Sequence, residues 1–395
     1  ISGTVTDDSG AVPQASVTLK FIGQILVKET GADGKYSFDS LNAGVYHIAV
    51  VKAGYAAVES LVTLDKEPQV YDAKLNPGAV STTVVVTDVA GKATASRMPI
   101  LNTEIPAQVS TISAETLQSQ SVNDLVTALR NASGVSARRF YGVYEYYTIR
   151  GFNQSDVQTV DGMRVEGNRF NTQLNNVEQV EVLKGPSSVL YGNGALAGII
   201  NIIRKKPQGT RAYDLFYRGG RWNLQNIGGG ATGPIIENKL LYRVDASYEH
   251  NSAWRGAGAD RVNLSPSITW LINSRNRVTV HESLNRDNFK GDGGLPLVVA
   301  NMPNFDLSRR FSTPFDFIHV RDSQTHVLFN STLTPQWEFR DGFFKRWTND
   351  RYFLTEGLTF LPATNSIDRY ALFFEHHRRP VMNQADIFGR FTLLG

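Results

Sequence analysis

Apolar and polar residues alternate along most of the chain from Ala212 to its end. Between Tyr242 and Glu249 every second residue is apolar, and the residues between them are charged or polar. This two-residue period predicts β-strands with one apolar face and one polar face. The same spacing, with two polar interruptions, recurs at Val327, Phe329, Leu333, Trp337 and Phe339. The pattern predicts about eight or nine strands, at residues 211–219, 224–232, 239–250, 261–272, 276–287, 324–339, 342–354, 368–376 and 382–394.

The polar face of these strands is rich in Arg, Asp, Asn and Glu, and the strand ends carry tyrosine and tryptophan. A soluble β-sandwich shows the same alternation, but it would bury the charged face at a cost of roughly several kcal/mol for each unpaired charge. A transmembrane β-barrel instead turns its apolar face to lipid and its polar face to a wet lumen, with aromatic girdles at both membrane interfaces. The pattern therefore predicts the first part of an antiparallel transmembrane β-barrel. Helical membrane proteins are excluded, because the best apolar run, at 197–203, is far shorter than the roughly 18 residues that a membrane helix needs.

Residues 1–76 have a different pattern, in which short apolar runs are separated by turns rich in Gly, Asp and Asn. This punctuation predicts a small antiparallel β-sandwich. The turn residues Asp7, Asp8 and Asp33 could in principle hold a calcium ion. Aspartates beside glycine more often accept hydrogen bonds from their own turn, and we expect that role here.

Residues 77–95 form a linker rich in Gly, Ala, Ser and Thr, interrupted by one apolar patch at 82–88. Such a patch could add a strand to the sheet edge of a partner, or it could be an ordinary edge strand of this chain. Residues 96–209 mix helix and strand patterns. Ser113 is placed to cap one helix, and residues 121–130 carry apolar side chains at helical spacing. Strand-like runs follow, so we predict a compact α+β domain.

Composition narrows the function further. The 40 basic and 37 acidic residues give a net charge of +3 without a basic stripe, which argues against a nucleic-acid partner. The absence of cysteine excludes disulfides and thiolate metal sites. We find no Gly-x-Ser-x-Gly, His-Glu-x-x-His or phosphate-loop motif, and His376 and His377 are adjacent on a strand, hence on opposite faces. We therefore expect neither an enzyme nor a bound cofactor.

The most specific signal lies in residues 177–203, preceded by Ile149-Arg150-Gly151 and by Val160-Asp161-Gly162. Together these segments closely resemble the plug domain of TonB-dependent outer-membrane receptors of the siderophore-receptor type. Residues 1–76 likewise resemble the carboxypeptidase-regulatory-like domain, a transthyretin-like sandwich. The resemblance implies a sandwich (1–76), a linker with a TonB box (77–95), a plug (96–209) and the N-terminal part of a barrel (210–395). Because plugged transporters of this kind have about 22 strands, we expect the barrel to be incomplete here.

The resemblance also implies roles for particular residues. The patch in the linker looks like a TonB box, the segment that the energising protein TonB pairs with. Its residues are Thr83, Val84, Val85, Val86 and Thr87. Two cations match plug positions that latch the plug to glutamates of the barrel, Arg150 and Lys184, although arginine is more usual at the second position. The upper loops of the plug would meet the ligand through Arg138, Arg139, Tyr141, Tyr144, Arg169 and Phe170, although most of these could instead be exposed loop residues.

A function follows from the resemblance as an expectation. It is import of a ferric siderophore across the bacterial outer membrane, with iron held by the siderophore and energy supplied by TonB and its inner-membrane complex. The protein would be a monomer in outer-membrane lipid, with the sandwich and the TonB box on the periplasmic side. Two alternatives stay open: import of an oligosaccharide, a vitamin or heme by the same route, and a surface receptor for signalling or adhesion that imports nothing.

Overall fold

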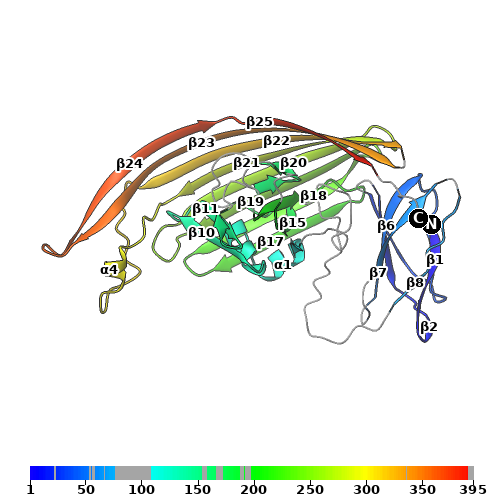
Figure 1. The fold of residues 1–395 in the computed structure, drawn as a ribbon, viewed down its shortest axis with the longest axis horizontal. Coiled ribbons are helices and arrows are strands. Elements are labelled where there is room, and N and C mark those ends of the chain that lie inside the picture. Colours follow the sequence, from blue (N-terminus) through cyan, green and yellow to red (C-terminus); the bar gives the residue numbers. More distant parts are fainter. Residues whose placement is uncertain are drawn as a thin grey trace.

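The computed structural model describes residues 1–21, 24–52, 55, 58–65, 67–75, 108–153, 158–165, 172–186, 191, 197–334 and 336–389. These residues form three parts: an N-terminal β-sandwich, a middle α+β domain and a large curved sheet that we call the wall (Figure 1). Among the helices in the described residues, none is long and apolar enough to cross a membrane.

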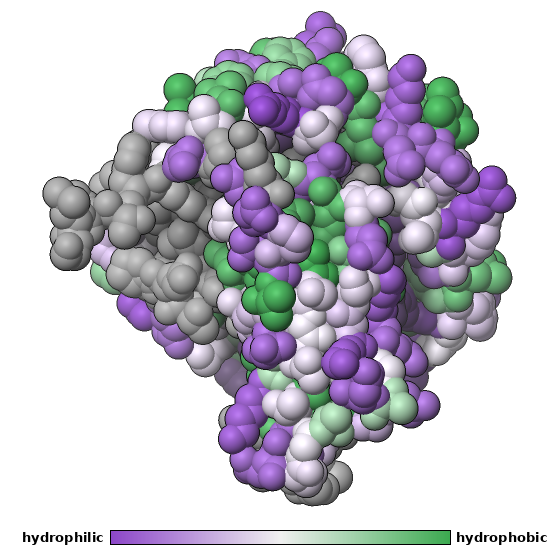
Figure 2. Space-filling model, turned by 90° about the vertical axis from the view of Figure 1, so that its right-hand side faces the viewer, coloured by the Kyte–Doolittle hydropathy of each residue, from purple (hydrophilic) through white to green (hydrophobic). Residues whose placement is uncertain are grey.

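The predicted sandwich is confirmed. Its first sheet has the order β2-β1-β5, with β8 pairing β1 in parallel, and its second has the order β4-β3-β6-β7. The strands are β1 (Ser2–Asp7), β2 (Gly10–Ala11), β3 (Ser16–Phe21), β4 (Gln24–Glu29), β5 (Lys35–Ser37), β6 (Gly44–Val51), β7 (Val58–Leu64) and β8 (Ala73–Lys74). The core contains fully buried Val5, Val17 and Ile48. At the end of the molecule that carries the sandwich, hydrophilic and hydrophobic residues are interspersed (Figure 2).

Asp7 and Asp33 accept hydrogen bonds from their own turns, as expected from the sequence, whereas Asp8 pairs with Lys74 at 2.8 Å. Asp7 Oδ1 accepts bonds from the Ser9 amide at 2.7 Å and the Gly10 amide at 3.0 Å, and Asp33 Oδ1 accepts one from Lys35 N at 3.2 Å. Hydrogen bonds from the Ser9 side chain, from Tyr55 and from the Ser9 amide lower the pKa of Asp7 to about 2. Asp7 therefore stays ionised and keeps its turn closed through most of the acidic range.

The middle domain combines two sheets with short helices. One sheet has the order β14-β13-β16-β15-β9 and the other the order β10-β11-β12. The strands are β9 (Gln108–Ser113), β10 (Val135–Phe140), β11 (Tyr144–Ile149), β12 (Phe152–Asn153), β13 (Gln158–Val160), β14 (Met163–Arg164), β15 (Val177–Lys184) and β16 (Gly198–Arg204). The helices are α1 (Ala114–Ser119), α2 (Leu125–Ala128) and the 3₁₀ turn η3 (Leu129–Asn131). Ser113 caps α1 as predicted, accepting a 3.2 Å hydrogen bond from Thr116 N.

The helix predicted over 121–130 was wrong at both ends. It begins only at Leu125, because Asp124 acts as its N-cap and accepts a 2.9 Å bond from the amide of Thr127. A capping aspartate has an extended backbone and so marks where a helix starts. The last turn then tightens into the 3₁₀ turn from Leu129.

The wall is an antiparallel sheet in which the predicted alternation is confirmed. Its strands are β17 (Ala212–Gly220), β18 (Leu224–Ile236), β19 (Leu240–Asn251), β20 (Ala259–Leu271), β21 (Asn276–Phe289), β22 (Phe317–Thr334), β23 (Trp337–Leu361), β24 (Ser366–Arg378) and β25 (Val381–Gly389). On β19 the charged residues Arg243, Asp245 and Glu249 are buried, whereas Tyr248 is exposed. The sheet curves around the middle domain, which lies on its concave side (Figure 1). The polar face therefore looks inward, as a barrel lumen requires.

The boundaries of the two longest strands were predicted wrongly, since β22 covers Phe317–Thr334 and β23 covers Trp337–Leu361. The pattern placed a single strand at 324–339 and a break near residue 341, but β22 ends at Thr334 and β23 runs unbroken through that break. Between these two strands the sequence holds Pro335, a residue type that has no amide hydrogen to donate to a ladder. Gly342 lies inside β23, where the lack of a side chain permits a close approach. A Cβ there would lie 2.6 Å from the sulfur of Met163, so the missing side chain lets the middle domain approach the wall.

The last two strands, β24 and β25, lie end to end along β23 like one interrupted strand. Both β24 and β25 pair with β23, the former along its second half and the latter along its first half. The interruption falls at Arg379-Pro380, where proline again cannot donate an amide hydrogen. The Pro380 carbonyl nevertheless accepts a 3.0 Å bond from Arg346 N, which keeps the two segments in line.

Candidate functional site

The β10–β11 hairpin of the middle domain reaches the wall with its tip. Val143 is almost fully buried in a cluster with Phe289, Ile318 and Leu354 of the wall. This end of the sheet also carries the long connection between β21 and β22, which includes the short helix α4 (Leu297–Ala300). The hairpin is therefore anchored at the end of the sheet that has the longest connection among the described wall strands.

Two residues predicted to meet the ligand, Tyr141 and Tyr144, take part in this anchor. The Tyr141 hydroxyl donates a 2.5 Å bond to Glu356 Oε2, and its pKa is raised by burial and by that carboxylate. The ring of Tyr144 meets that of Tyr352 edge-on at 5.9 Å. Both tyrosines thus contact the wall in this structure, and a role in ligand contact stays a prediction.

The outward face of the same hairpin carries a different group, which we call the apical cluster: Arg138, Phe140 and Tyr146. Arg138 and Tyr146 are directly opposite in the strand register. The guanidinium of Arg138 lies 5.1 Å from the centre of the Phe140 ring, and that ring meets Tyr146 edge-on at 4.6 Å. All three side chains are exposed. A cation beside aromatic rings suits a flat-sided anionic complex, and the role of Arg138 in ligand contact stays a prediction.

The sequence reasoning missed Phe140 and Tyr146. Alternate residues of a strand lie on one face, so the prediction for Arg138 also points to the residues that share its face of the hairpin. Arg139 lies on the other face, where it forms an ion pair with Asp124. Arg169 and Phe170 lie outside the described residues.

The two predicted latch cations are brought together. Lys184 is buried and donates to Ser110 Oγ at 2.8 Å and to Ser133 Oγ at 3.2 Å, while Arg150 donates to Gln108 Oε1 at 3.3 Å. Burial and the neighbouring charge of Arg150 lower the pKa of Lys184. Neither cation forms an ion pair with a carboxylate within the part of the chain that the structure describes. The predicted TonB box, from Thr83 to Thr87, lies outside that part.

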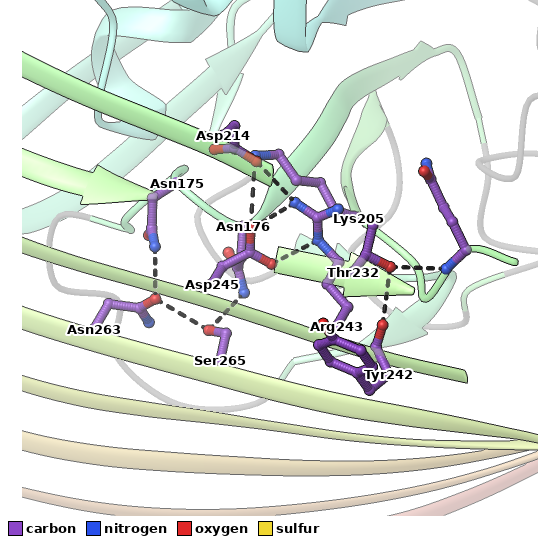
Figure 3. Close-up of polar contacts among 11 residues, drawn as sticks. Asn175, Asn176, Lys205, Asp214, Thr232, Tyr242, Arg243, Asp245, Asn263 and Ser265 are labelled. Atoms are coloured by element: carbon purple, nitrogen blue, oxygen red, sulfur yellow. Dashed lines mark hydrogen bonds and ion pairs between the residues drawn. The ribbon is translucent and has the colours of Figure 1, made fainter. Parts of the chain in front are cut away.

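Polar contacts join the middle domain to the wall along several strands. Asn175 Nδ2 donates to Asn263 Oδ1 at 2.8 Å, and Asn176 Nδ2 donates to Ser265 Oγ at 2.9 Å (Figure 3). Asn123 bonds to Glu249 at 2.5 Å. These contacts lie between residues that are mostly buried yet hydrophilic, so this part of the interface is polar.

A charged cluster closes one side of this interface. Lys205, which follows β16, lies 3.7 Å from Asp245 and 4.0 Å from Asp214, and Arg243 forms a bidentate pair with Asp245 at 2.7 Å (Figure 3). The two carboxylates thus share two cations. Such networks are more favourable than isolated surface pairs because each charge has more than one partner.

A polar cavity of about 80 Å³ lies between the middle domain and the wall. Two ion pairs of the wall line it, Arg261 with Asp287 at 3.3 Å and Arg346 with Asp322 at 2.6 Å. From the middle domain it is lined by Gln158 among others. A space of this size and polarity can hold a few water molecules. The middle domain therefore rests on the wall through polar contacts around this cavity and also through apolar contacts, which include those of Val143 and of the wall residue Phe344.

Parts of this chain are similar to known protein families and to known proteins. The TonB-dependent receptor plug domain model matches residues 102–199, and the carboxypeptidase regulatory-like domain model matches residues 1–76. Among curated proteins, the ferrioxamine B receptor of Salmonella typhimurium is 28% identical over 234 residues, which is 56% of this chain and 33% of that protein. The probable TonB-dependent siderophore receptor PiuA of Acinetobacter baumannii is 30% identical over 204 residues, which is 50% of this chain and 27% of that protein.

Solved structures show the same fold. The ferric-catecholate import receptor Fiu of E. coli K12 superposes with a TM-score of 0.70 at 20% identity, covering 77% of this chain and 49% of that one. The siderophore receptor PiuA gives a TM-score of 0.69 at 22% identity, over 76% of this chain and 45% of that one. The chain spans about a quarter to a third of the length of the curated relatives that it matches.

Proposed function

We propose, on the premise that this chain carries the plug and part of the barrel of a TonB-dependent receptor, that the protein imports a ferric siderophore across the bacterial outer membrane. The observation that carries the proposal is the position of the plug on the concave, polar side of the wall, with the apical cluster of Arg138, Phe140 and Tyr146 exposed at the end with the long connection. The siderophore receptors to which the chain is similar support this cargo class.

The mechanism follows from the contacts of the plug. Cargo binds at the apical cluster, where arginine attracts an anionic chelate and the rings pack against its flat side. Occupancy shifts the population in which the TonB box is accessible. TonB then pairs with the box as an added strand and pulls. The polar contacts between plug and wall can break because water replaces each hydrogen bond that is lost.

The latch belongs to this mechanism. Arg150 and Lys184 repel each other, and burial makes the charge of Lys184 costly. Carboxylates on barrel strands outside the described residues would offset both effects and hold the resting plug. Lysine cannot form the bidentate pair that arginine forms with a carboxylate, so we expect a weaker latch than an arginine pair would make.

Growth of a strain that lacks the gene tests the proposed function. With a ferric siderophore as the only iron source, the strain should fail to grow on at least one hydroxamate or catecholate chelate, and the intact gene should restore growth. Loss of growth on an oligosaccharide, a vitamin or heme alone would assign another cargo to the same route. Normal growth on every nutrient would reject transport and favour a surface receptor.

A single substitution tests the cargo site. In the full-length receptor, Arg138→Ala should weaken binding of the transported ferric siderophore by about tenfold to a hundredfold, because one charge-assisted hydrogen bond contributes about 1.5–3 kcal/mol. Titration of the purified receptor, followed by fluorescence quenching, measures the dissociation constant. The matched control is Arg130→Ala, which removes the same charge from another exposed position of the plug. An unchanged dissociation constant for Arg138→Ala would remove this residue from the cargo site.

A further inference from the structure

A buried carboxylate lies just beneath the apical cluster. Glu145 of β11 is only 4% exposed. Its oxygens accept hydrogen bonds from the Tyr147 hydroxyl at 2.5 Å, from Thr172 N at 2.7 Å and from Thr172 Oγ1 at 2.7 Å. A buried charge is retained only where such bonds compensate for lost solvation, and this carboxylate has three. The transport mechanism above assigns it no role.

Three segments of the plug meet at this carboxylate. Glu145 is opposite Arg139 in the hairpin register, and Arg139 pairs with Asp124, the cap of α2. The carbonyl of Thr172 accepts a 3.2 Å bond from Leu125 N, which ties the same helix to the segment after residue 171. We call Asp124, Arg139, Glu145, Tyr147 and Thr172 the Glu145 node.

The node borders two contacts with the wall. Gln173, next to Thr172, donates from Nε2 to Asp287 Oδ1 at 3.0 Å. Asn123, next to Asp124, donates to Glu249 Oε2 at 2.5 Å. On its other side, the hairpin that supplies Glu145 presents Arg138 and Tyr146 to the outside. The node therefore lies between the surface proposed to bind cargo and two of the bonds that hold the plug to the wall.

We propose that Glu145 is a positioning residue that couples occupancy of the apical cluster to the plug–wall bonds at Gln173 and Asn123. The inference deepens the proposed function and rests on it for the identity of the cargo. Its physical basis is that short, buried hydrogen bonds transmit a shift of the hairpin, whereas exposed ones exchange with water. Coupling requires that both sites favour one of two arrangements of a shared element, and the Glu145 node is the element that they share.

Hydrogen exchange of the full-length receptor tests the proposal. Peptides covering residues 123–125 and 172–177 are followed by mass spectrometry in the native protein, in Glu145→Gln and in the control Glu178→Gln. The control makes the same chemical change at an exposed position of the same domain. Without any ligand, Glu145→Gln should exchange about tenfold faster at residues 172–177, because it weakens charge-assisted bonds. The control should match the native protein.

Addition of ferrioxamine B, and separately of a ferric catecholate, provides the second readout. A probe that binds should change exchange at both peptides in the native protein and in Glu178→Gln. Glu145→Gln should bind the same probe but lose the change at residues 172–177. Thr172→Val, which removes one of the three bonds and keeps the side-chain shape, should give the same result with a smaller effect, and it replaces Glu145→Gln if that variant does not fold.

The outcomes separate this proposal from the proposed function. Native exchange rates in Glu145→Gln, or a probe response equal to that of the native protein, would overturn the coupling. If neither probe binds the native receptor, these two chelates are not its cargo, and the growth test described above decides the cargo class. The ligand-free comparison then decides the positioning role by itself: faster exchange in Glu145→Gln supports it, and unchanged exchange rejects it.

Discussion

Deletion of residues 83–87 from the full-length receptor is expected to reduce uptake of the ferric siderophore to background while cargo binding remains. The deletion removes the backbone amides and carbonyls with which TonB would pair, and strand addition depends on those groups for affinity. Uptake of ⁵⁵Fe-labelled siderophore by cells measures the first quantity, and binding to de-energised cells measures the second.

Two further variants separate the pairing from the length of the linker. Val85→Pro removes one amide hydrogen without shortening the chain, so it should also block uptake, because proline cannot donate to a ladder. Val85→Thr keeps both the amide and the β-branched shape and should transport normally. Deletion of residues 89–93 serves as the length control. If cells carrying the 83–87 deletion still accumulate iron at the native rate, these residues are not the TonB box.

The second large effect is expected at the ion pair between Arg204 and Asp161. Arg204 Nε donates a 2.7 Å bond to Asp161 Oδ2, and both side chains are at most 10% exposed. Arg204→Met leaves the Asp161 carboxylate buried with only part of its bonding, which should destabilise the plug by about 3–5 kcal/mol. Urea unfolding of the full-length receptor, followed by hydrogen exchange in the plug, measures the loss.

A double variant provides the control. Asp161→Asn combined with Arg204→Met removes both charges, so its loss should be clearly smaller than that of Arg204→Met alone. Asparagine suits this position because Asp161 has a φ of 51°, which asparagine tolerates. Equal losses in the single and double variants would mean that the two charges are not coupled.

Acid pH gives an independent check of the same pair. Burial by itself would raise the pKa of Asp161, but Arg204 and Lys206 outweigh burial and hold that pKa below its ordinary value of 3.8. A lowered carboxyl pKa contributes stability above the ordinary value, and this contribution is lost as the pH falls below it. The difference in stability between the native protein and Arg204→Met should therefore narrow in acid.

The sheet and its inward polar face could be predicted because a two-residue period reports directly on which side of a strand is solvated. The end of β22 at Thr334 and the unbroken course of β23 through Gly342 could not be predicted. Glycine in a strand is consistent with either a turn or a close approach, and only the position of Met163 against the wall distinguishes them. The start of α2 was predicted too early because Asp124 is compatible both with the helical pattern and with an N-cap. The hydrogen bond that Asp124 accepts from the Thr127 amide identifies it as the N-cap.

The residues in and near the apical cluster also differ in how far the sequence predicts them. Arg138 could be predicted from the plug resemblance, and Phe140 and Tyr146 follow once the hairpin is known. Glu145 could not be predicted, because Thr172, which donates two of its three hydrogen bonds, lies 27 residues away in the chain. The contacts of Tyr141 and Tyr144 likewise depend on strand β23, more than 200 residues further on.

The length of β23 has a consequence for how cargo would first meet the receptor. Its 25 residues span roughly 80 Å along the strand, whereas a tilted strand needs only about 9–11 residues to cross the hydrocarbon layer. In the proposed orientation, the second half of β23 and its partner β24 therefore rise well above the lipid headgroups. They would form a vestibule that collects dilute chelate from the medium, so capture would begin far from the lipid and before any movement of the plug.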